Sequence, residues 1–392
     1  MMNDATLWDR IAYLLKKLNR QIGTLMFKTY TRRKGEKLDK ILERNPQNVH
    51  VLYQRSLYRQ ARSDWEGAIS DITKALALDP ENSYALRLRG KALNYKGEYI
   101  DAIADLSEFI RQNPRNSSGY YHRAAAFLRQ GDIQLAINDY TEALRINPGD
   151  KYSFYWRAIA YVQQGDLDLA LSDMDQAVKF GRQDGQMYTG RARVHQLRNE
   201  ITQAHNDFNR AVKLDPTEAS FYYERAKFFA AQRNFDKAIT NYDQAIAKAN
   251  VPVLDHYVFR GAARIKTADL AGGISDYQQL TELSPETAEY WNTLCWYGCL
   301  ANRAAEFLYA GEKAVTLSPA ATSARDTRGL ARALTGDLAG AIEDFRFFID
   351  HFDADKWPQL YSEMRQQWVA ELERGHNPIN VTVLQRLLEE GQ

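Results

Sequence analysis

Arginine recurs in this chain with an aspartate sixteen residues after it. One example is Arg123 with Asp139, in a stretch otherwise rich in small and aromatic residues. A guanidinium and a carboxylate can form a bidentate ion pair, which is stronger and more directional than most side-chain hydrogen bonds. The spacing therefore predicts a series of structural salt bridges: Arg55–Asp71, Arg89–Asp105, Arg123–Asp139, Arg157–Asp173, Arg191–Asp207, Arg260–Asp276 and Arg328–Asp344.

Two members of the series depart from this pattern. Arg225 is followed by Asn241, and Leu294 is followed by Ala310. The repeat with Leu294 in place of the arginine is thus also the repeat with no polar group, Ala310, at the partner position. This indicates pairing inside one repeat rather than between neighbouring repeats. The alternative is a row of arginines presented to an anionic ligand.

Prolines set the period of the series. Pro46, Pro80, Pro114 and Pro148 are 34 residues apart, and Pro216 lies two periods further on. With proline at position 32 of a repeat, the arginine falls at position 7 and its partner at position 23. Apolar or small residues recur at positions 4, 8, 11, 20, 24 and 27, which is the spacing of one helix face. In the third repeat these are Tyr120, Ala124, Phe127, Ala136, Tyr140 and Ala143.

A short turn divides each repeat into two helices. Pairs such as Gly131-Asp132 and Gly165-Asp166 suit a glycine that ends helix A and an acid that caps helix B. Proline at position 32 then ends helix B. Each repeat is therefore predicted to be a hairpin of two helices.

This pattern resembles the tetratricopeptide repeat family over residues 49–355, in repeats that begin at residues 49, 83, 117, 151, 185, 219, 254, 288 and 322. The resemblance implies an all-α fold, a right-handed superhelical α-solenoid of about nine hairpins whose A helices line a concave surface. Arg182, Asn250 and Asp353 replace the proline. Phe307 stands where the family has a small residue, which leaves the packing of the eighth repeat open.

The resemblance also implies a function. It predicts a scaffold or adaptor that binds a peptide or helical segment of another protein in the concave groove, through positions 2, 5, 9 and 12 of helix A. The alternative is that these rings pack between helices. The residues at or beside these positions are Tyr53, Tyr84, Arg87, Lys91, Asn94, Tyr121, His122, Tyr152, Tyr155, Trp156, Tyr223 and Lys227. The family's clamp for chaperone C-termini is disfavoured, because His122 occupies one of its asparagine positions.

Other kinds of function find little support. Lys and Arg number 51 and Asp and Glu 50, a balance that argues against nucleic-acid binding. Cys295 and Cys299 are half of a zinc site at most, so we expect reduced cysteines, no metal and no cofactor. An enzyme with an unrecognised site and an RNA-binding solenoid remain alternatives. No secretory leader or membrane span is evident, and a cytoplasmic location is expected.

The two ends depart from the repeat. Residues 1–48 are expected to form a degenerate leading repeat that caps the solenoid, with 11 Lys or Arg and 5 Asp or Glu in residues 1–45. A basic amphipathic helix that tethers a regulatory subunit to an anionic membrane or acidic partner is the alternative. Residues 356–392 are expected to cap the other end, with Trp357, Trp368 and Leu372 covering the last repeat.

Overall fold

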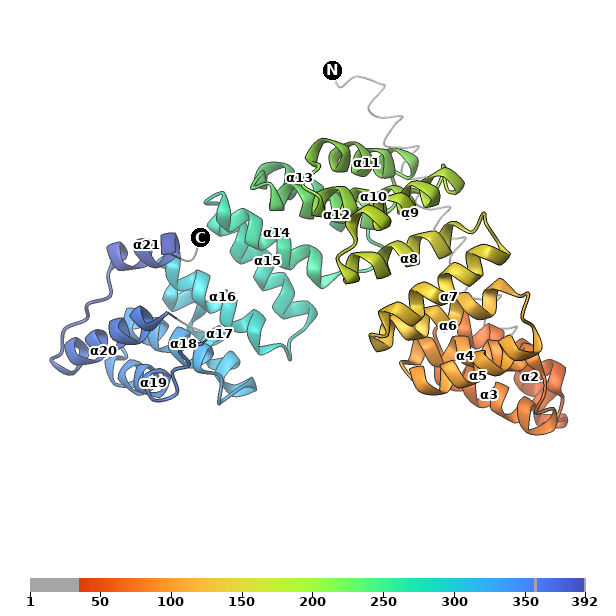
Figure 1. Ribbon diagram of the computed structural model, residues 1–392. Helices are drawn as coiled ribbons and strands as arrows, with labels where there is room; N and C mark the ends of the chain where they lie inside the picture. The colour runs from red at the N-terminus through yellow and green to blue at the C-terminus, as the bar shows by residue number, and fades with distance from the viewer. Residues whose placement is uncertain (1–34, 356–357, 391–392) are drawn as a thin grey trace, which may run out of the picture. The chain divides into compact units, whose positions relative to one another are not determined.

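The computed structural model describes residues 35–355 and 358–390, and over these residues it contains helices and turns without a strand (Figure 1). The expectation of an all-α fold of helix hairpins is confirmed. The chain forms two compact parts, residues 1–182 and 183–392, and each is described by itself. We call them the N-terminal and C-terminal parts.

The N-terminal part consists of helix hairpins. Its described residues begin in a helix that ends at residue 44. The helices that follow are α2 (Val49–Gln60), α3 (Trp65–Leu78), α4 (Ser83–Lys96), α5 (Tyr99–Gln112), α6 (Ser117–Gln130), α7 (Ile133–Ile146), α8 (Lys151–Gln164) and α9 (Leu167–Phe180). Each even-numbered helix is a helix A. It packs on the next helix, its helix B, and α3, α5 and α7 each also pack on the helix A that follows them.

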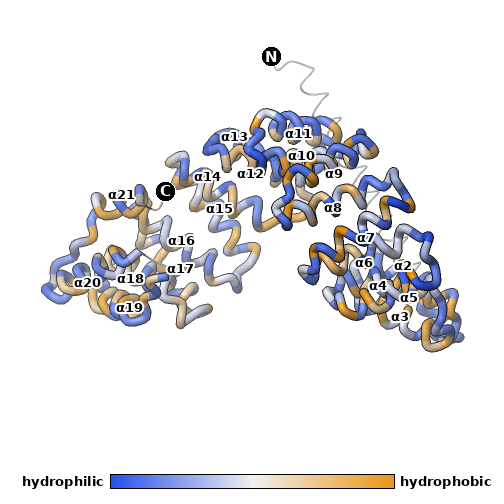
Figure 2. The backbone as a smooth tube through the Cα atoms, in the orientation of Figure 1, coloured by the Kyte–Doolittle hydropathy of each residue, from blue (hydrophilic) through white to orange (hydrophobic). Residues whose placement is uncertain are grey.

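The C-terminal part continues this alternation and adds two helices. Its repeats contain α10 (Gly185–Leu197), α11 (Ile201–Leu214), α12 (Ala219–Ala231), α13 (Phe235–Lys248), α14 (Leu254–Lys266), α15 (Leu270–Leu283), α16 (Ala288–Leu300), α17 (Ala304–Leu317), α18 (Thr322–Thr335) and α19 (Leu338–Asp350). After them come α20 (Gln359–Glu373) and α21 (Val381–Glu390). Figure 2 shows hydrophobic and hydrophilic segments alternating along the helices, as amphipathic helices require.

The turn between helices A and B differs from the expectation in one respect. Gly131 ends its helix A with φ of 98°, a left-handed conformation that glycine adopts without strain. However, the side chain of the following Asp132 makes no capping hydrogen bond. An acid caps helix B at Asp64, Asp269 and Asp337, where the residue three places later is glycine. A β-carbon on that glycine would collide with the aspartate carboxylate as it is placed in these three caps. Asn234 still caps its helix B where the residue three places later is Lys237.

Small residues at positions 8 and 20 let helices A and B approach closely. Ala124 and Ala136 are fully buried in the third repeat. The eighth repeat reverses the sizes: Phe307 at position 20 is buried, and Gly298 at position 11 leaves room for its ring. The large residue thus moves from helix A to helix B, and the packing of this repeat is intact.

Both ends are covered within the described residues. Leu38 and Leu42, in the helical residues before α2, are buried against Leu52. The apolar and basic stretch proposed as a cap or docking helix lies mostly in residues 1–34, outside the described residues. At the other end α20 packs on α19 and buries Trp368 and Leu372, whereas Trp357 also lies outside the described residues.

Candidate protein-binding site

The predicted arginine–aspartate partners contact each other through two hydrogen bonds. In the third repeat, Arg123 Nε and Nη2 donate to the two carboxylate oxygens of Asp139 at 2.7 and 2.9 Å. The same two-point contact links the helix A arginine to the helix B aspartate at Arg55, Arg89, Arg157, Arg191, Arg260 and Arg328. Arg225 makes a single bond of this kind, to Asn241 Oδ1 at 2.8 Å.

The third guanidinium nitrogen of seven of the helix A arginines reaches the preceding repeat. Arg123 Nη1 donates to Ser107 Oγ at 3.0 Å, and Arg157 Nη1 donates to Thr141 Oγ1 at 2.9 Å. The acceptor stands at position 25 of the preceding helix B. The same relationship holds in the pairs Arg55–Asp39, Arg89–Thr73, Arg225–Asn209, Arg260–Asp243 and Arg328–Glu312. The arginine therefore joins neighbouring repeats as well as the two helices of its own repeat.

In three repeats a second arginine joins the ion pair. Arg59, Arg264 and Arg332 occupy position 11, where the sequence analysis expected an apolar residue. Each places Nη1 3.0 Å from the position-23 aspartate of its own repeat. Asp71 and Asp276 each have two guanidinium partners, and Asp344 has a third, Arg325 Nη1 at 3.2 Å; all three aspartates are no more than 2% exposed. The expectation of apolar residues at position 11 is therefore wrong in these repeats, because a buried carboxylate accepts the second charge.

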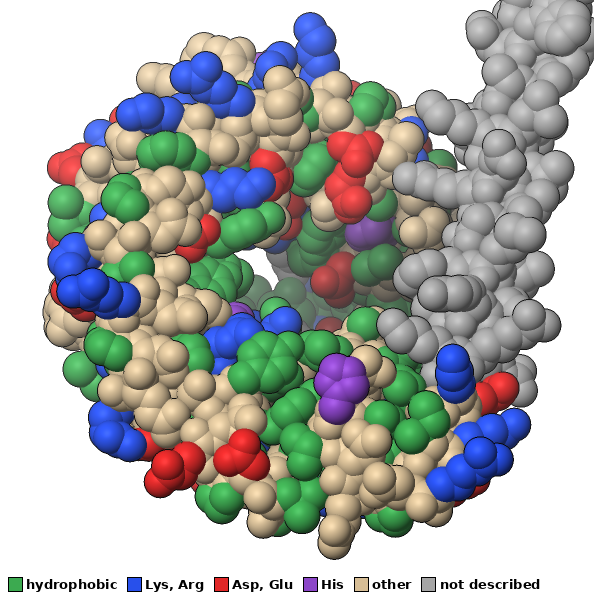
Figure 3. All heavy atoms as spheres, turned by 90° about the vertical axis from the view of Figure 1, so that its right-hand side faces the viewer, with side chains coloured by type: hydrophobic (Ala, Val, Ile, Leu, Met, Phe, Trp, Pro, Cys, Tyr) green, Lys and Arg blue, Asp and Glu red, His purple; other side chains and the backbone are tan. Residues whose placement is uncertain are grey.

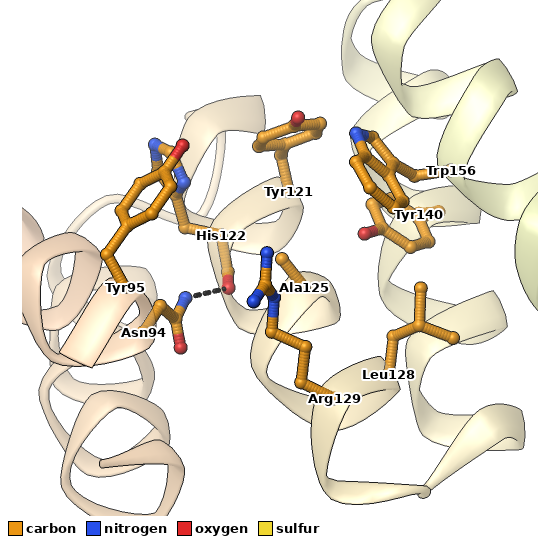
Figure 4. Close-up of a pocket in the computed structure, with 9 residues that line it drawn as sticks. All are labelled: Asn94, Tyr95, Tyr121, His122, Ala125, Leu128, Arg129, Tyr140 and Trp156. Carbon is orange, nitrogen blue, oxygen red and sulfur yellow. Dashed lines mark hydrogen bonds between the residues drawn. The ribbon is translucent and has the colours of Figure 1, made fainter. Parts of the chain in front are cut away.

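A pocket lies on the A helices of the N-terminal part (Figure 4). It has a volume of about 120 Å³ and is bounded by α4, α6, α7 and α8. A single water molecule needs a cavity of only about 10–15 Å³. The pocket therefore has room for several waters or one small side chain. Its lining residues are Asn94, Tyr95, Tyr121, His122, Ala125, Leu128, Arg129, Tyr140 and Trp156.

Two buried polar atoms at this pocket have unused hydrogen-bonding capacity. The Tyr140 side chain is fully buried, and its hydroxyl has no hydrogen-bond partner among the described residues. Asn94 donates from Nδ2 to the His122 backbone carbonyl at 2.7 Å, but its Oδ1 has no partner there either. Buried polar groups without partners are uncommon and costly in folded proteins. These two atoms therefore mark places where a ligand can make hydrogen bonds.

Aromatic rings form much of the pocket wall. The Tyr121 ring lies edge-on to His122 and to Tyr140, with centroids 5.2 and 5.9 Å apart. Burial, with a contribution from Asp150, raises the pKa of Tyr121 to about 12, so its hydroxyl stays protonated. Figure 4 shows the Arg129 guanidinium beside Ala125, toward the middle of the pocket.

His122 is neutral at physiological pH. Burial, together with the positive charges of Lys91 and Arg87, lowers its pKa to about 4. The neutral ring keeps one nitrogen as a donor and one as an acceptor. The permanent positive charge at the pocket therefore comes from Arg129, which is exposed.

The pocket brings together only part of the predicted groove set: Asn94, Tyr121, His122 and Trp156. Tyr53 and Tyr84 instead contact each other at 5.9 Å, and the Arg87 guanidinium lies over the Tyr84 ring. The Tyr152 ring is exposed beneath Lys151, and Tyr155 is buried beside Trp156.

Tyr223 and Lys227 belong to the C-terminal part. There the Lys227 ammonium lies 5.3 Å from the Tyr223 ring, and Tyr223 contacts Tyr242 and His256. These rings pack between helices, as the alternative interpretation of the groove residues states.

The sequence analysis missed three pocket residues. Tyr95 and Arg129 both occupy position 13 of helix A, one residue past the expected stripe. Position 13 follows position 9 by four residues, so the helical period could have found them. Tyr140, at position 24, was assigned to packing alone, and the pattern carries no sign of its free hydroxyl.

Comparison with known families decides which family the chain belongs to. The model of the tetratricopeptide repeat matches residues 53–117, 95–151, 121–188 and 189–252, which is just over half of the chain. This chain is a tetratricopeptide repeat protein. That membership supports a scaffold for interactions between proteins, and proteins of the family are generally not enzymes.

Solved structures of other tetratricopeptide repeat proteins resemble this one. A protein from Parabacteroides merdae is 19% identical with a TM-score of 0.49, over 60% of this chain and 93% of that one. PilF from Pseudomonas aeruginosa is 17% identical with a TM-score of 0.44, over 54% and 96%. YrrB, described as having an unusual peptide-binding site, is 20% identical with a TM-score of 0.36, over 45% and 91%. No curated protein matches the chain.

The described residues of this tetratricopeptide repeat protein offer no second kind of site by metal ligation. They contain no group of three or more His, Cys, Asp or Glu side chains placed to hold a metal ion. Cys295 and Cys299 are buried and free, and a hydrogen bond with Cys295, together with burial, raises the pKa of Cys299. No described helix is long and apolar enough to cross a membrane. Figure 3 shows acidic and basic side chains scattered among hydrophobic ones on the face in view.

Proposed function

We propose that this chain is a protein–protein interaction scaffold or adaptor. Its N-terminal part holds an extended or helical segment of a partner protein across the A helices α4, α6 and α8, and the pocket between them takes one acidic side chain of that segment. The observation that carries the proposal is the pair of unpartnered buried atoms, Tyr140 Oη and Asn94 Oδ1, in a pocket that also has the Arg129 guanidinium.

The chemistry of the pocket favours an acid. Arg129 supplies a charged donor, and the Tyr140 hydroxyl supplies a neutral one. None of the lining residues named above is an Asp or Glu, so a carboxylate meets no like charge on the pocket wall. Asn94 Oδ1 accepts a hydrogen bond from the backbone N–H of the segment. The tyrosine and tryptophan rings give contact area at a low cost in conformational entropy.

The other parts of the proposal follow from the same features. The partner is a protein rather than a nucleic acid, because the charges of the chain are balanced. The free buried cysteines favour a reducing location, which we assign to the cytoplasm.

Selection of peptides from a random library tests the function. We expect the wild-type chain to enrich peptides that carry Asp or Glu beside an apolar residue. Trp156→Ala removes a wall of the pocket and is expected to abolish enrichment, whereas Arg129→Gln is expected to remove the preference for acids.

Two control variants make the test specific to the pocket. Tyr309→Ala removes an exposed ring of α17 in the C-terminal part, and Arg145→Gln removes an exposed arginine that pairs with Glu142. Both are expected to select the same peptides as wild type. Identical selection by wild type and Trp156→Ala, with circular dichroism showing both folded, contradicts a binding site at this pocket.

A further inference from the structure

Helix α21 does not continue the pattern of hairpins. In each repeat helix B packs on the helix A before it, but α21 packs on α16, the helix A of the eighth repeat. On the way, Asn377 Nδ2 donates to the Ala333 carbonyl of α18 at 2.7 Å, and Arg386 Nη2 contacts Met364 Sδ of α20 at 3.6 Å. In Figure 1 α21 is drawn beside α16 and apart from α19. The last segment of the chain therefore lies across successive A helices.

The segment docks through one apolar face. Ile379, Leu384 and Leu387 are 5%, 2% and 1% exposed, whereas Thr382 and Gln385 on the other side of the helix are exposed. The three buried residues belong to the same hydrophobic cluster as residues of α16 and α18. The segment thus binds as an amphipathic helix binds in a groove, through apolar residues at helical spacing.

The surface beneath α21 is apolar at positions 9 and 12 of both helices that form it. Position 9 of helix A is basic in three repeats, at Lys91, Arg193 and Lys227, and apolar in the other six, among them Trp296 in α16 and Leu330 in α18. Position 12 is Cys299 in α16 and Ala333 in α18. Leu330, Cys299 and Ala333 are each no more than 1% exposed. The groove beneath α21 is therefore apolar at both positions, and it carries none of the charges found at Lys91, Arg193 and Lys227.

Capping of the last repeat does not require α21. Helix α20 covers that end: it packs on α19, and its fully buried Arg365 makes a two-point ion pair with Asp326 of α18 at 2.8 and 2.7 Å. The Arg365 guanidinium also lies 4.5 Å from the Trp368 ring centroid. Helix α21 therefore covers the apolar face of α16 and α18, whereas α20 covers the end of the last repeat.

We propose that the face of α16 and α18 beneath α21 is a binding site for an amphipathic helix of a partner protein, with α21 as its intramolecular competitor. The partner helix carries large aliphatic residues at the spacing of Val383, Leu384, Leu387 and Leu388. A helix of ten residues is marginal in water by itself, so α21 is helical because it is docked. A partner helix that displaces it leaves it to unfold.

The test uses the full chain and a fluorescent synthetic peptide of residues 376–390. The double substitution Leu384→Asp, Leu387→Asp removes the apolar face of α21 from the groove. The docked segment competes at an effective concentration of about millimolar. Since this competition is lost in the variant, we expect the peptide to bind the variant at least about tenfold more tightly than it binds wild type.

The matched control is Thr382→Asp, Gln385→Asp, which adds the same charge to the exposed face of α21. This control is expected to bind the peptide as weakly as wild type. A peptide that itself carries the two aspartates in place of Leu384 and Leu387 is expected to bind none of the proteins. The proposal is overturned if the peptide fails to bind the folded Leu384→Asp, Leu387→Asp chain, or binds it and wild type equally.

Hydrogen exchange in the wild-type chain gives an answer that does not depend on the variant folding. We expect amides of residues 381–390 to exchange at least about tenfold faster than those of α18, because α21 opens without the repeats unfolding. Equal protection of α21 and α18 makes α21 a permanent part of the fold and overturns the proposal.

Discussion

Arg157 and Asp173 are joined at two points, by hydrogen bonds of 2.7 and 2.8 Å from Nε and Nη2 to the two carboxylate oxygens. Their side chains are 16% and 7% exposed. The remaining nitrogen, Nη1, bonds to Thr141 of the preceding repeat. One arginine on α8 therefore links α7, α8 and α9.

Removing only one member of this ion pair is expected to lower the free energy of unfolding more than removing both members. Arg157→Leu leaves the Asp173 carboxylate buried without its partner, and loss of one member of a buried pair typically costs about 3–5 kcal/mol. Arg157→Leu combined with Asp173→Leu resembles Leu294 and Ala310 of the eighth repeat and is expected to lose less. Urea unfolding of wild type, both single variants and the double variant checks this. A double variant whose loss equals the sum of the single losses contradicts the pairing.

Thr141→Val is expected to weaken the link between the third and fourth repeats. The substitution keeps the shape of the side chain but removes two hydrogen bonds of Thr141 Oγ1, the one that it accepts from Arg157 Nη1 and the one that it donates to the Ile137 backbone carbonyl. The loss of each costs about 1 kcal/mol. Thr73→Val is the matched control, because Arg89 Nη1 is 3.4 Å from Thr73 Oγ1 and loses a weaker contact. Unfolding monitored by circular dichroism should show the larger shift for Thr141→Val. Equal shifts would argue against a role for this contact.

The reversed sizes in the eighth repeat predict a rescue. Phe307→Ala leaves a cavity and is expected to cost about 3–5 kcal/mol. Gly298→Leu alone is expected to be severe, since even a β-carbon at Gly298 meets the Phe307 ring. The two changes together restore the arrangement of the third repeat, where Phe127 faces the small Ala136. Thermal melting should show the double variant to be more stable than Gly298→Leu; a double variant less stable than both single variants would contradict this packing.

Stability at acid pH is expected to depend on His122. Its pKa is about 4 in the folded protein, below the ordinary value. Between that value and about pH 6.5 the unfolded chain binds a proton that the folded chain excludes, so stability falls as pH falls through this window. At about 1.4 kcal/mol for each pKa unit, the loss is at most about 3 kcal/mol.

Urea midpoints at pH 7 and pH 4.5 test this dependence. His122→Gln is expected to lose less stability than wild type on acidification, whereas His50→Gln, at an exposed site, should behave as wild type. Parallel losses in wild type and His122→Gln would show that His122 is not the group responsible.

Tyr140→Phe is expected to separate binding from stability. The buried hydroxyl has no partner within residues 35–355 and 358–390, so its removal should leave the free energy of unfolding unchanged or raise it by up to about 1 kcal/mol. Peptides selected by wild type should bind Tyr140→Phe more weakly, because the hydroxyl is a donor in the pocket. Tyr242→Phe removes a similarly unpartnered hydroxyl in the C-terminal part and should leave peptide affinity unchanged. Equal affinity of all three proteins would remove Tyr140 from the site.

Much of the fold could be predicted because its interactions are local. Positions 7 and 23 lie sixteen residues apart in one hairpin, so the spacing of Arg123 and Asp139 reports their contact directly. The repeat also predicts which alanines are buried between helices. The groove was predicted less well. Tyr95 and Arg129 lie four residues after position 9 and could have been found from the helical period, but the burial of the Tyr140 hydroxyl depends on how neighbouring helices stack, which leaves no mark in the spacing within one repeat.

By itself, the sequence determined the period, the helix hairpins and the residues that tie each hairpin together, since a short turn leaves two amphipathic helices one way to pack. Only the tertiary structure decided the third contact of each arginine, the unpartnered hydroxyl of Tyr140 and the docking of α21 on α16. These features depend on surfaces that meet across different repeats. The way the repeats stack decides which atoms are buried without a hydrogen-bond partner, and a pattern of residues within one repeat does not encode that stacking.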